Sequence, residues 1–263
     1  PATAYVLKQQ RWYFHSASAS SNRIVGGSPT VISQHPWMVQ VENQDLAGFW
    51  RQNCAGNILT TRYFLSAAHC FEGSAYSPRL RRIRAGSEDM HTGGVVAYVE
   101  QEFNHPTYGQ LGYDGDITVV RLMTPLMFTS NIGQATIVAQ GSVIPQGFQV
   151  VKAGWGAITE NGWPAGQLRE VVVYTINNTL CRDRYQNLPP VGTHIVTPNM
   201  ICAGILDVGG KDACYRDAGG PVYFNMMVIG IISWGHGCGN ATFPGVSTNV
   251  GSYTDWIVST VQG

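Results

Sequence analysis

The feature that most constrains the fold is a series of short apolar or alternating runs, each ended by glycine, proline, asparagine or serine. The clearest runs lie at 37–41, 83–85, 95–99, 117–122, 148–153, 170–175 and 227–233. Runs this short, with turn signals between them, are typical of strands in an all-β barrel or sandwich. Only the tail differs, because 254–261 has a capping-type first residue and apolar side chains at helical spacing, which predicts a terminal helix.

Length and charge narrow the class of protein. A chain of 263 residues can bury a substantial core, as one unit or as two packed domains. The 31 glycines and only 12% charged residues are unlike a disordered or coiled-coil protein. The formal net charge is zero, and the one basic cluster, Arg79 to Arg84, alternates with apolar residues. We interpret that cluster as an edge strand with a solvated face, and we expect neither a nucleic-acid nor a membrane partner.

The cysteine pattern indicates an oxidising compartment. Six cysteines occur without a Cys-x-x-Cys pair, so three disulfides explain them better than zinc does, with fifteen pairings open. No apolar run approaches the roughly 20 residues of a membrane span. The first residues lack an apolar signal core, so we expect any secretory signal to have been removed or omitted. Sequons at Asn177 and Asn240 fit a secreted chain.

Three segments carry residues suited to acyl-transfer chemistry. Leu65-Ser-Ala-Ala-His-Cys70 holds a histidine, whose ordinary pKa near 6.5 suits proton transfer at neutral pH. Asp114-Gly-Asp-Ile-Thr-Val-Val-Arg-Leu122 offers a carboxylate that could orient such an imidazole. The third segment reads Lys211-Asp-Ala-Cys-Tyr-Arg-Asp-Ala-Gly-Gly-Pro-Val222.

Together these segments resemble the histidine, aspartate and nucleophile motifs of trypsin-like serine proteases, in the chymotrypsin-type order. The family's Gly-Asp-Ser-Gly-Gly-Pro is matched by Arg216-Asp217-Ala218-Gly219-Gly220-Pro221. The attacking serine is therefore Ala218, and a glycine is replaced by Arg216. Asn57 to Leu65 is similar to insect trypsins, a group that includes moth midgut trypsins and cocoonase.

The resemblance implies a fold and a domain order. It implies two packed six-stranded antiparallel β-barrels of the all-β, chymotrypsin-like class, with a C-terminal helix on the outside. Residues 1–23 would be a propeptide, 24–135 the N-terminal barrel, and 136–263 the C-terminal barrel with its helix. The disulfides implied are Cys54–Cys70, Cys181–Cys202 and Cys214–Cys238.

The resemblance also implies a role for each site residue. His69, Asp116 and position 218 would be catalytic, and the backbone N–H groups of Arg216 and Ala218 would form the oxyanion hole. The substrate pocket would be formed by Asp212, Ala213, Ser233, Gly235 and Gly245.

Asp212 would select Arg or Lys before the scissile bond, because burying a carboxylate unpaired is costly. Ala213 lacks the hydroxyl that would help to hold a lysine, so we expect Arg to be preferred. Gly86 to Met90 lacks the acidic pair of the calcium loop of vertebrate trypsins, so we expect no metal, and no other cofactor.

Activation would occur at Arg23–Ile24, inside Asn22-Arg-Ile-Val-Gly-Gly27, which on its own could also be a chance turn after a linker. The new Ile24 amine would pair with Asp217. In the uncut chain Asp217 would lack that partner, and we expect the loop around it to be displaced or mobile.

Two accounts of Ala218 remain open. Either an active enzyme was disabled by substitution, or the chain is a natural homologue that binds or regulates without cutting. We favour the first account, because an Arg-specific enzyme would cut its own Arg23–Ile24 bond, so an intact precursor requires disabling. The partners expected are protein or peptide substrates and an activating protease, with the chain acting as an extracellular monomer.

Overall fold

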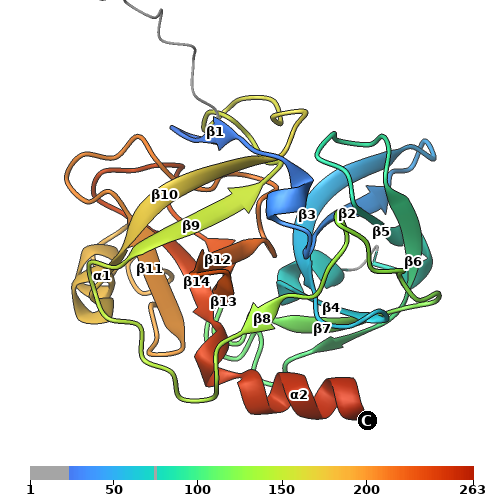
Figure 1. Ribbon diagram of the computed structural model, residues 1–263. Helices are drawn as coiled ribbons and strands as arrows, with labels where there is room; N and C mark the ends of the chain where they lie inside the picture. Colours follow the sequence, from blue (N-terminus) through green and yellow to red (C-terminus); the bar gives the residue numbers. More distant parts are fainter. Residues whose placement is uncertain (1–23, 74–75) are drawn as a thin grey trace, which may run out of the picture.

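Two closed β-barrels form the body of the molecule, as predicted (Figure 1). The structure is a computed structural model that describes residues 24–73 and 76–263. The expected propeptide, with Arg23, lies outside the described residues. All seven runs singled out in the sequence overlap strands of these barrels, because alternating side chains face a barrel interior and the turn residues end each strand.

The first barrel has six antiparallel strands, and its last neighbour pairing, β5 with β2, closes it. Val39, Val41 and Ile83 are fully buried in its interior. Its strands are β2 (Met38–Gln44), β3 (Trp50–Ile58), β4 (Tyr63–Ser66), β5 (Arg81–Ala85), β6 (Val95–Asn104) and β7 (Thr118–Leu122).

The second barrel also has six antiparallel strands, closed by the pairing of β9 with β10. Two short strands are added to it: β1 (Ser28–Pro29) pairs with β10, and β8 (Thr136–Ile137) lies parallel to β13. Its strands are β9 (Gln149–Gly154), β10 (Arg169–Ile176), β11 (Met200–Gly204), β12 (Pro221–Phe224), β13 (Met227–Trp234) and β14 (Gly245–Asn249). The proposed domain boundary falls in the segment between β7 and β9.

The terminal helix is confirmed, as α2 (Thr254–Gln262), lying outside the barrels (Figure 1). Its start differs from the expectation, because Thr254 is not a side-chain cap: its hydroxyl donates to the carbonyls of Val138, at 2.8 Å, and Val250, at 3.0 Å. None of the described helices is long and apolar enough to cross a membrane.

The expectation that only the tail would be helical was wrong. A second helix, α1 (Asn178–Tyr185), starts at Asn177, whose side chain accepts the Leu180 N–H at 3.1 Å. An asparagine N-cap is a sequence signal that could have revealed it. Four 3₁₀ turns complete the described elements: η1 (Ile32–Gln34), η2 (Ala68–Phe71), η3 (Pro78–Leu80) and η4 (Val250–Ser252).

The interpretation of the basic cluster as an edge strand was also wrong. Residues 81–85 form β5, which lies between β2 and β6 in a closed barrel and therefore has no free edge. Arg82 and Arg84 donate from Nε to Glu42 at 2.5 and 2.9 Å, and Glu42 is fully buried. The guanidinium groups are thus partners of a buried carboxylate, because an unpaired charge there would be costly.

Three disulfides join the pairs that the resemblance implied, Cys54–Cys70, Cys181–Cys202 and Cys214–Cys238. The first links β3 to η2, the second links α1 to β11, and the third ties the segment before Ala218 to the loop after β13. Two of them therefore fix backbone next to the predicted site.

Candidate active site

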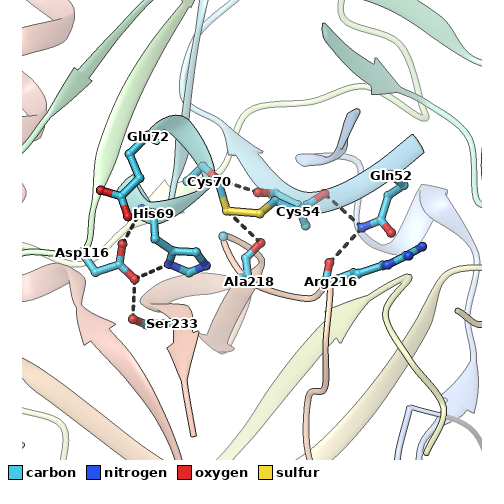
Figure 2. Close-up of a disulfide and its surroundings, with 12 residues drawn as sticks. Gln52, Cys54, His69, Cys70, Glu72, Asp116, Arg216, Ala218 and Ser233 are labelled. Atoms are coloured by element: carbon cyan, nitrogen blue, oxygen red, sulfur yellow. Dashed lines mark hydrogen bonds and ion pairs between the residues drawn. A yellow bond between two sulfur atoms is a disulfide. The ribbon is translucent and has the colours of Figure 1, made fainter. Parts of the chain in front are cut away.

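His69 and Asp116 lie together, as the motif order implied (Figure 2). His69 sits in the 3₁₀ turn η2 directly after β4, and the neighbouring Cys70 is bonded to Cys54 on β3. Its Nδ1 lies 2.7 Å from Asp116 Oδ2, and its backbone N–H donates to Asp116 Oδ1 at 2.9 Å. An ionised carboxylate only accepts hydrogen bonds, so it fixes the proton on Nδ1 and leaves Nε2 as a base.

Asp116 is held from both barrels. It lies two residues before β7 of the first barrel and is fully buried. Ser233 Oγ, on β13, donates to its Oδ2 at 2.5 Å, and Thr248 Oγ1, on β14, donates to its backbone carbonyl at 2.7 Å. Ser233 was predicted as a substrate-pocket residue; it does line the cavity, but its hydroxyl is directed to the carboxylate.

Asp114, two residues before Asp116, lies in a turn, where an acidic side chain is usually solvated, but here it has partners within the protein. Its carboxylate is half-buried and accepts from the hydroxyl of Thr197 and from Asn199 Nδ2, at 3.2 Å to Oδ1. Both partners belong to the second half of the chain, so Asp114 contributes to holding the two barrels together rather than to the chemistry.

The environment of His69 favours its protonated form. Burial alone would lower the pKa of the imidazole, but the hydrogen bond and negative charge of Asp116, with a smaller effect from Glu72, outweigh it and raise the pKa. A histidine whose imidazolium is stabilised in this way is suited to take a proton and then to return it.

Ala218 lines the same cavity as His69, and Figure 2 shows the imidazole ring between Asp116 and Ala218. The Ala218 carbonyl accepts the Ala55 N–H at 2.8 Å, which fixes the nucleophile segment against β3. Arg216 has a φ of 78°, a region that favours glycine, and its carbonyl accepts from Gln52 Nε2 at 2.8 Å. In the described part of the chain, the N–H groups of Arg216 and Ala218 donate to no other atom.

Asp217, between them, is fully buried. Its carboxylate accepts the N–H of Gly156 at 2.7 Å and of Cys214 at 2.9 Å. A Cβ on Gly154 or Gly156 would lie 2.0 or 2.6 Å from that carboxyl group, so these glycines make room for it. These contacts tie down the loop that we expected to be displaced or mobile.

Burial raises the pKa of Asp217 to about 7, against the lowering effect of its two N–H donors. No cationic group forms an ion pair with it among residues 24–73 and 76–263. Ile24, the residue after the predicted cleavage site, is itself fully buried.

The predicted substrate pocket is a cavity of about 490 Å³ that reaches from His69 and Ala218 to Asp212. Ala213, Gly235 and Gly245 also line it. Asp212 is 4% exposed, and its backbone N–H donates to the Val25 carbonyl at 3.1 Å.

One charged residue of this cavity, Lys152 on β9, was not predicted from the sequence. Its Nζ lies 2.6 Å from Asp212 Oδ1, and the side chain is 1% exposed. The sequence contained one signal for it, a single charged residue within an apolar strand. Such a residue needs a partner when the strand is buried.

The arrangement supplies most parts of an acyl-transfer site. An oriented base lies beside residue 218, two backbone N–H groups are free to bind an oxyanion, and a pocket opens next to them. Only the nucleophilic oxygen is missing, because alanine has none.

Comparison with known proteins agrees with this geometry. The family model described as Trypsin matches residues 24–257. "Trypsin, alkaline C" of Manduca sexta is 40% identical over 239 residues, covering 91% of each chain. "Trypsin CFT-1" of Choristoneura fumiferana is 40% identical over 89% of this chain and 90% of its own length. The "Vitellin-degrading protease" of Bombyx mori is 34% identical, over 89% and 84%. The chain therefore belongs to the trypsin family of serine proteases.

Proposed function

We propose that the chain is the precursor of a secreted endopeptidase that cleaves after Arg or Lys, disabled because Ala218 occupies the serine position. The observation that carries this proposal is the 2.7 Å pair of His69 Nδ1 and Asp116 Oδ2, beside residue 218 and above a pocket that contains Asp212. Three disulfides support an oxidising, extracellular location.

With serine restored at position 218, each group has a step to perform. The serine oxygen attacks the substrate carbonyl while His69 takes its proton, and the Arg216 and residue-218 N–H groups stabilise the oxyanion. His69 then protonates the leaving amine. Water repeats the sequence and releases the acid, and Asp116 keeps the imidazole in the required tautomer throughout.

Specificity depends on Asp212. A long cationic side chain that enters the cavity would reach this carboxylate, and Ala213 provides no hydroxyl to favour lysine over arginine. The preference for a cationic over an uncharged side chain depends on how much of the Asp212 charge remains available after its pairing with Lys152.

Activation is proposed at Arg23–Ile24. Asp217 is buried without a cationic partner, and the α-amino group released at Ile24 would supply one. The Val25 carbonyl already accepts the Asp212 N–H, so the segment after the cleavage site is connected to the pocket. An active enzyme of this specificity would cut the bond itself, and Ala218 would explain a precursor that stays whole.

The proposed partners are protein substrates and an activating protease, with the chain acting as a monomer. Cocoonase is the narrower assignment among insect trypsins that we propose, on the Asn57–Leu65 segment and the three disulfides. Its test is whether the restored enzyme digests cocoon protein faster than dietary protein.

The alternative is a natural non-catalytic homologue with a binding or regulatory role. The two are separated by Ala218→Ser, cleavage after Arg23 with an added protease, and assay on an unfolded protein and an arginyl peptide. We expect turnover that a second change, His69→Ala, abolishes. No turnover from a folded, cleaved enzyme would favour the homologue.

A further inference from the structure

The cation nearest to Asp212 is supplied by the protein itself. Lys152 extends from β9, its side chain is 1% exposed, and its Nζ lies 2.6 Å from Asp212 Oδ1 and 3.1 Å from the Ala203 carbonyl. It is the one charged residue of β9. A buried lysine without a carboxylate partner would be costly, so the pair is expected to persist when the pocket is empty.

The pairing uses most of the hydrogen-bonding capacity of Asp212. Oδ1 accepts from Lys152 Nζ and from the Ala213 N–H, at 2.6 and 2.8 Å, and Oδ2 accepts the Gly245 N–H at 3.0 Å. A carboxylate has about four lone-pair sites, so about one is left. An arginyl guanidinium binds a free carboxylate through two parallel bonds, and Asp212 cannot offer both.

The ammonium group also lies where a substrate cation would have to go. Lys152 and Asp212 line the same cavity. A Cβ placed on Gly245 would lie 2.6 Å from Asp212 Oδ2 and 2.8 Å from Lys152 Nζ, so both charged groups lie directly against the pocket wall. A second cation that approaches Asp212 would meet a like charge at close range, where partial burial weakens screening.

We infer that Lys152 is a specificity-determining residue of the primary pocket, which neutralises Asp212 and weakens the selection of Arg and Lys. The inference rests on the proposed protease function and modifies its substrate class. Two of the three ammonium N–H groups have acceptors among the described residues, and the third can donate to a ligand. Long uncharged side chains that end in an acceptor, glutamine foremost, therefore become competitive with arginine before the scissile bond.

The first test uses the chain with Ala218 and needs no catalysis. Benzamidinium, a rigid cation that mimics an arginyl side chain, is titrated calorimetrically into the unaltered chain, Lys152→Met and Lys211→Met. Methionine keeps the length of lysine without its charge, and Lys211 is an exposed lysine adjacent to Asp212 in the sequence, so it is the matched control. We expect Lys152→Met to bind at least about tenfold more tightly, and Lys211→Met to stay within about twofold of the unaltered chain. Unchanged or weaker binding by folded Lys152→Met would overturn the inference.

The second test does not depend on how Lys152→Met folds. Cleaved Ala218→Ser enzyme is assayed on matched peptides that differ only in Arg or Gln before the scissile bond. We expect kcat/KM for Arg to exceed that for Gln by less than about tenfold, whereas a ratio above about 10³ would overturn the role of Lys152.

The two proposals fail in different ways. A fluorophosphonate forms a bond from phosphorus to an activated serine oxygen and releases fluoride, whatever side chain the pocket prefers. If Ala218→Ser is labelled but the Arg-to-Gln ratio exceeds 10³, only the inference on Lys152 fails. If the folded, cleaved enzyme is neither labelled nor active, the proposed function fails as well.

Discussion

The two ends of the cavity each contain an ion pair. At the end proposed to be catalytic, the His69–Asp116 pair lies beside Ala218, which lacks the oxygen of a serine. At the floor, Asp212 is paired with Lys152. Both ends contain a carboxylate paired with a nitrogen base at 2.6–2.7 Å. The imidazole is partly exposed and can exchange a proton in the cavity, while the ammonium is buried and paired with its carboxylate. In the proposed enzyme, the same kind of pair would therefore serve chemistry at one end of the cavity and limit substrate binding at the other.

The largest expected effect is a loss of catalytic rate when the His69–Asp116 pair is disrupted. In the Ala218→Ser enzyme, Asp116→Asn should lower kcat roughly 10⁴-fold, the size found for chymotrypsin-type triads, because an amide no longer enforces the tautomer that makes Nε2 a base. Steady-state kinetics on one peptide measures it. A loss below tenfold would mean that Asp116 does not orient His69.

The next effect concerns Asp217, which lies in the sequence between Asp212 and Ala218. Its folded pKa of about 7 is above the unfolded value near 3.9, so the folded state holds the proton more tightly. The contribution of Asp217 to the free energy of unfolding is therefore fully present below about pH 4 and is lost as the pH rises towards 7, by up to about 4 kcal/mol. Urea unfolding of the uncut chain from pH 4 to 8 measures it.

The control is Asp217→Asn, which cannot ionise and should lose this slope whatever its overall stability. The chain cut after Arg23 should lose it too, because the new amine would stabilise the carboxylate. A slope that survives in Asp217→Asn would assign the titration to another group.

A smaller effect tests where the Asp212–Lys152 pair lies against the wall of the cavity. Gly245→Ala would place a Cβ within 3.0 Å of Asp212 and Lys152, and should cost about 1–3 kcal/mol of unfolding free energy. Gly235→Ala is the matched change on the same wall, where the nearest atom is 3.6 Å away, and should cost less. Equal costs, measured by urea unfolding, would contradict the position of the ion pair.

The smallest effect tests the support that the second barrel gives to the catalytic end. Ser233→Ala removes the hydroxyl that donates to Asp116 Oδ2 at 2.5 Å. One hydrogen bond of about 1 kcal/mol corresponds to a loss of roughly fivefold to tenfold in kcat of the Ala218→Ser enzyme. Ser233→Thr keeps the hydroxyl and should restore most of the rate. A Ser233→Ala enzyme of full activity would remove Ser233 from the catalytic machinery.

The two ends also differ in how well their residues could be predicted from the sequence. Short runs predicted the barrels, and motif frames brought out His69, Asp116, Asp212 and Asp217, because each role is fixed by a position relative to a local pattern. Lys152 lies in no such local motif. It reaches Asp212 across 60 residues of sequence, through the closure of the second barrel, and only the assembled fold brings them together.

The prediction of a solvated edge strand at Arg82 and Arg84 was wrong for the same physical reason. Alternation along β5 was visible, but the buried Glu42 that turns those arginines inward lies on a different strand. α1 was missed differently, because a helix of eight residues with polar side chains has little apolar periodicity.

The most direct test of the central claim, a trypsin-family site complete except for one oxygen, is covalent labelling by a fluorophosphonate followed by intact mass measurement. The chain with Ala218 should take no label. After Ala218→Ser and cleavage behind Arg23, we expect one adduct per chain, on residue 218, and none when His69→Ala is added. A folded, cleaved Ala218→Ser chain that stays unlabelled would contradict the account.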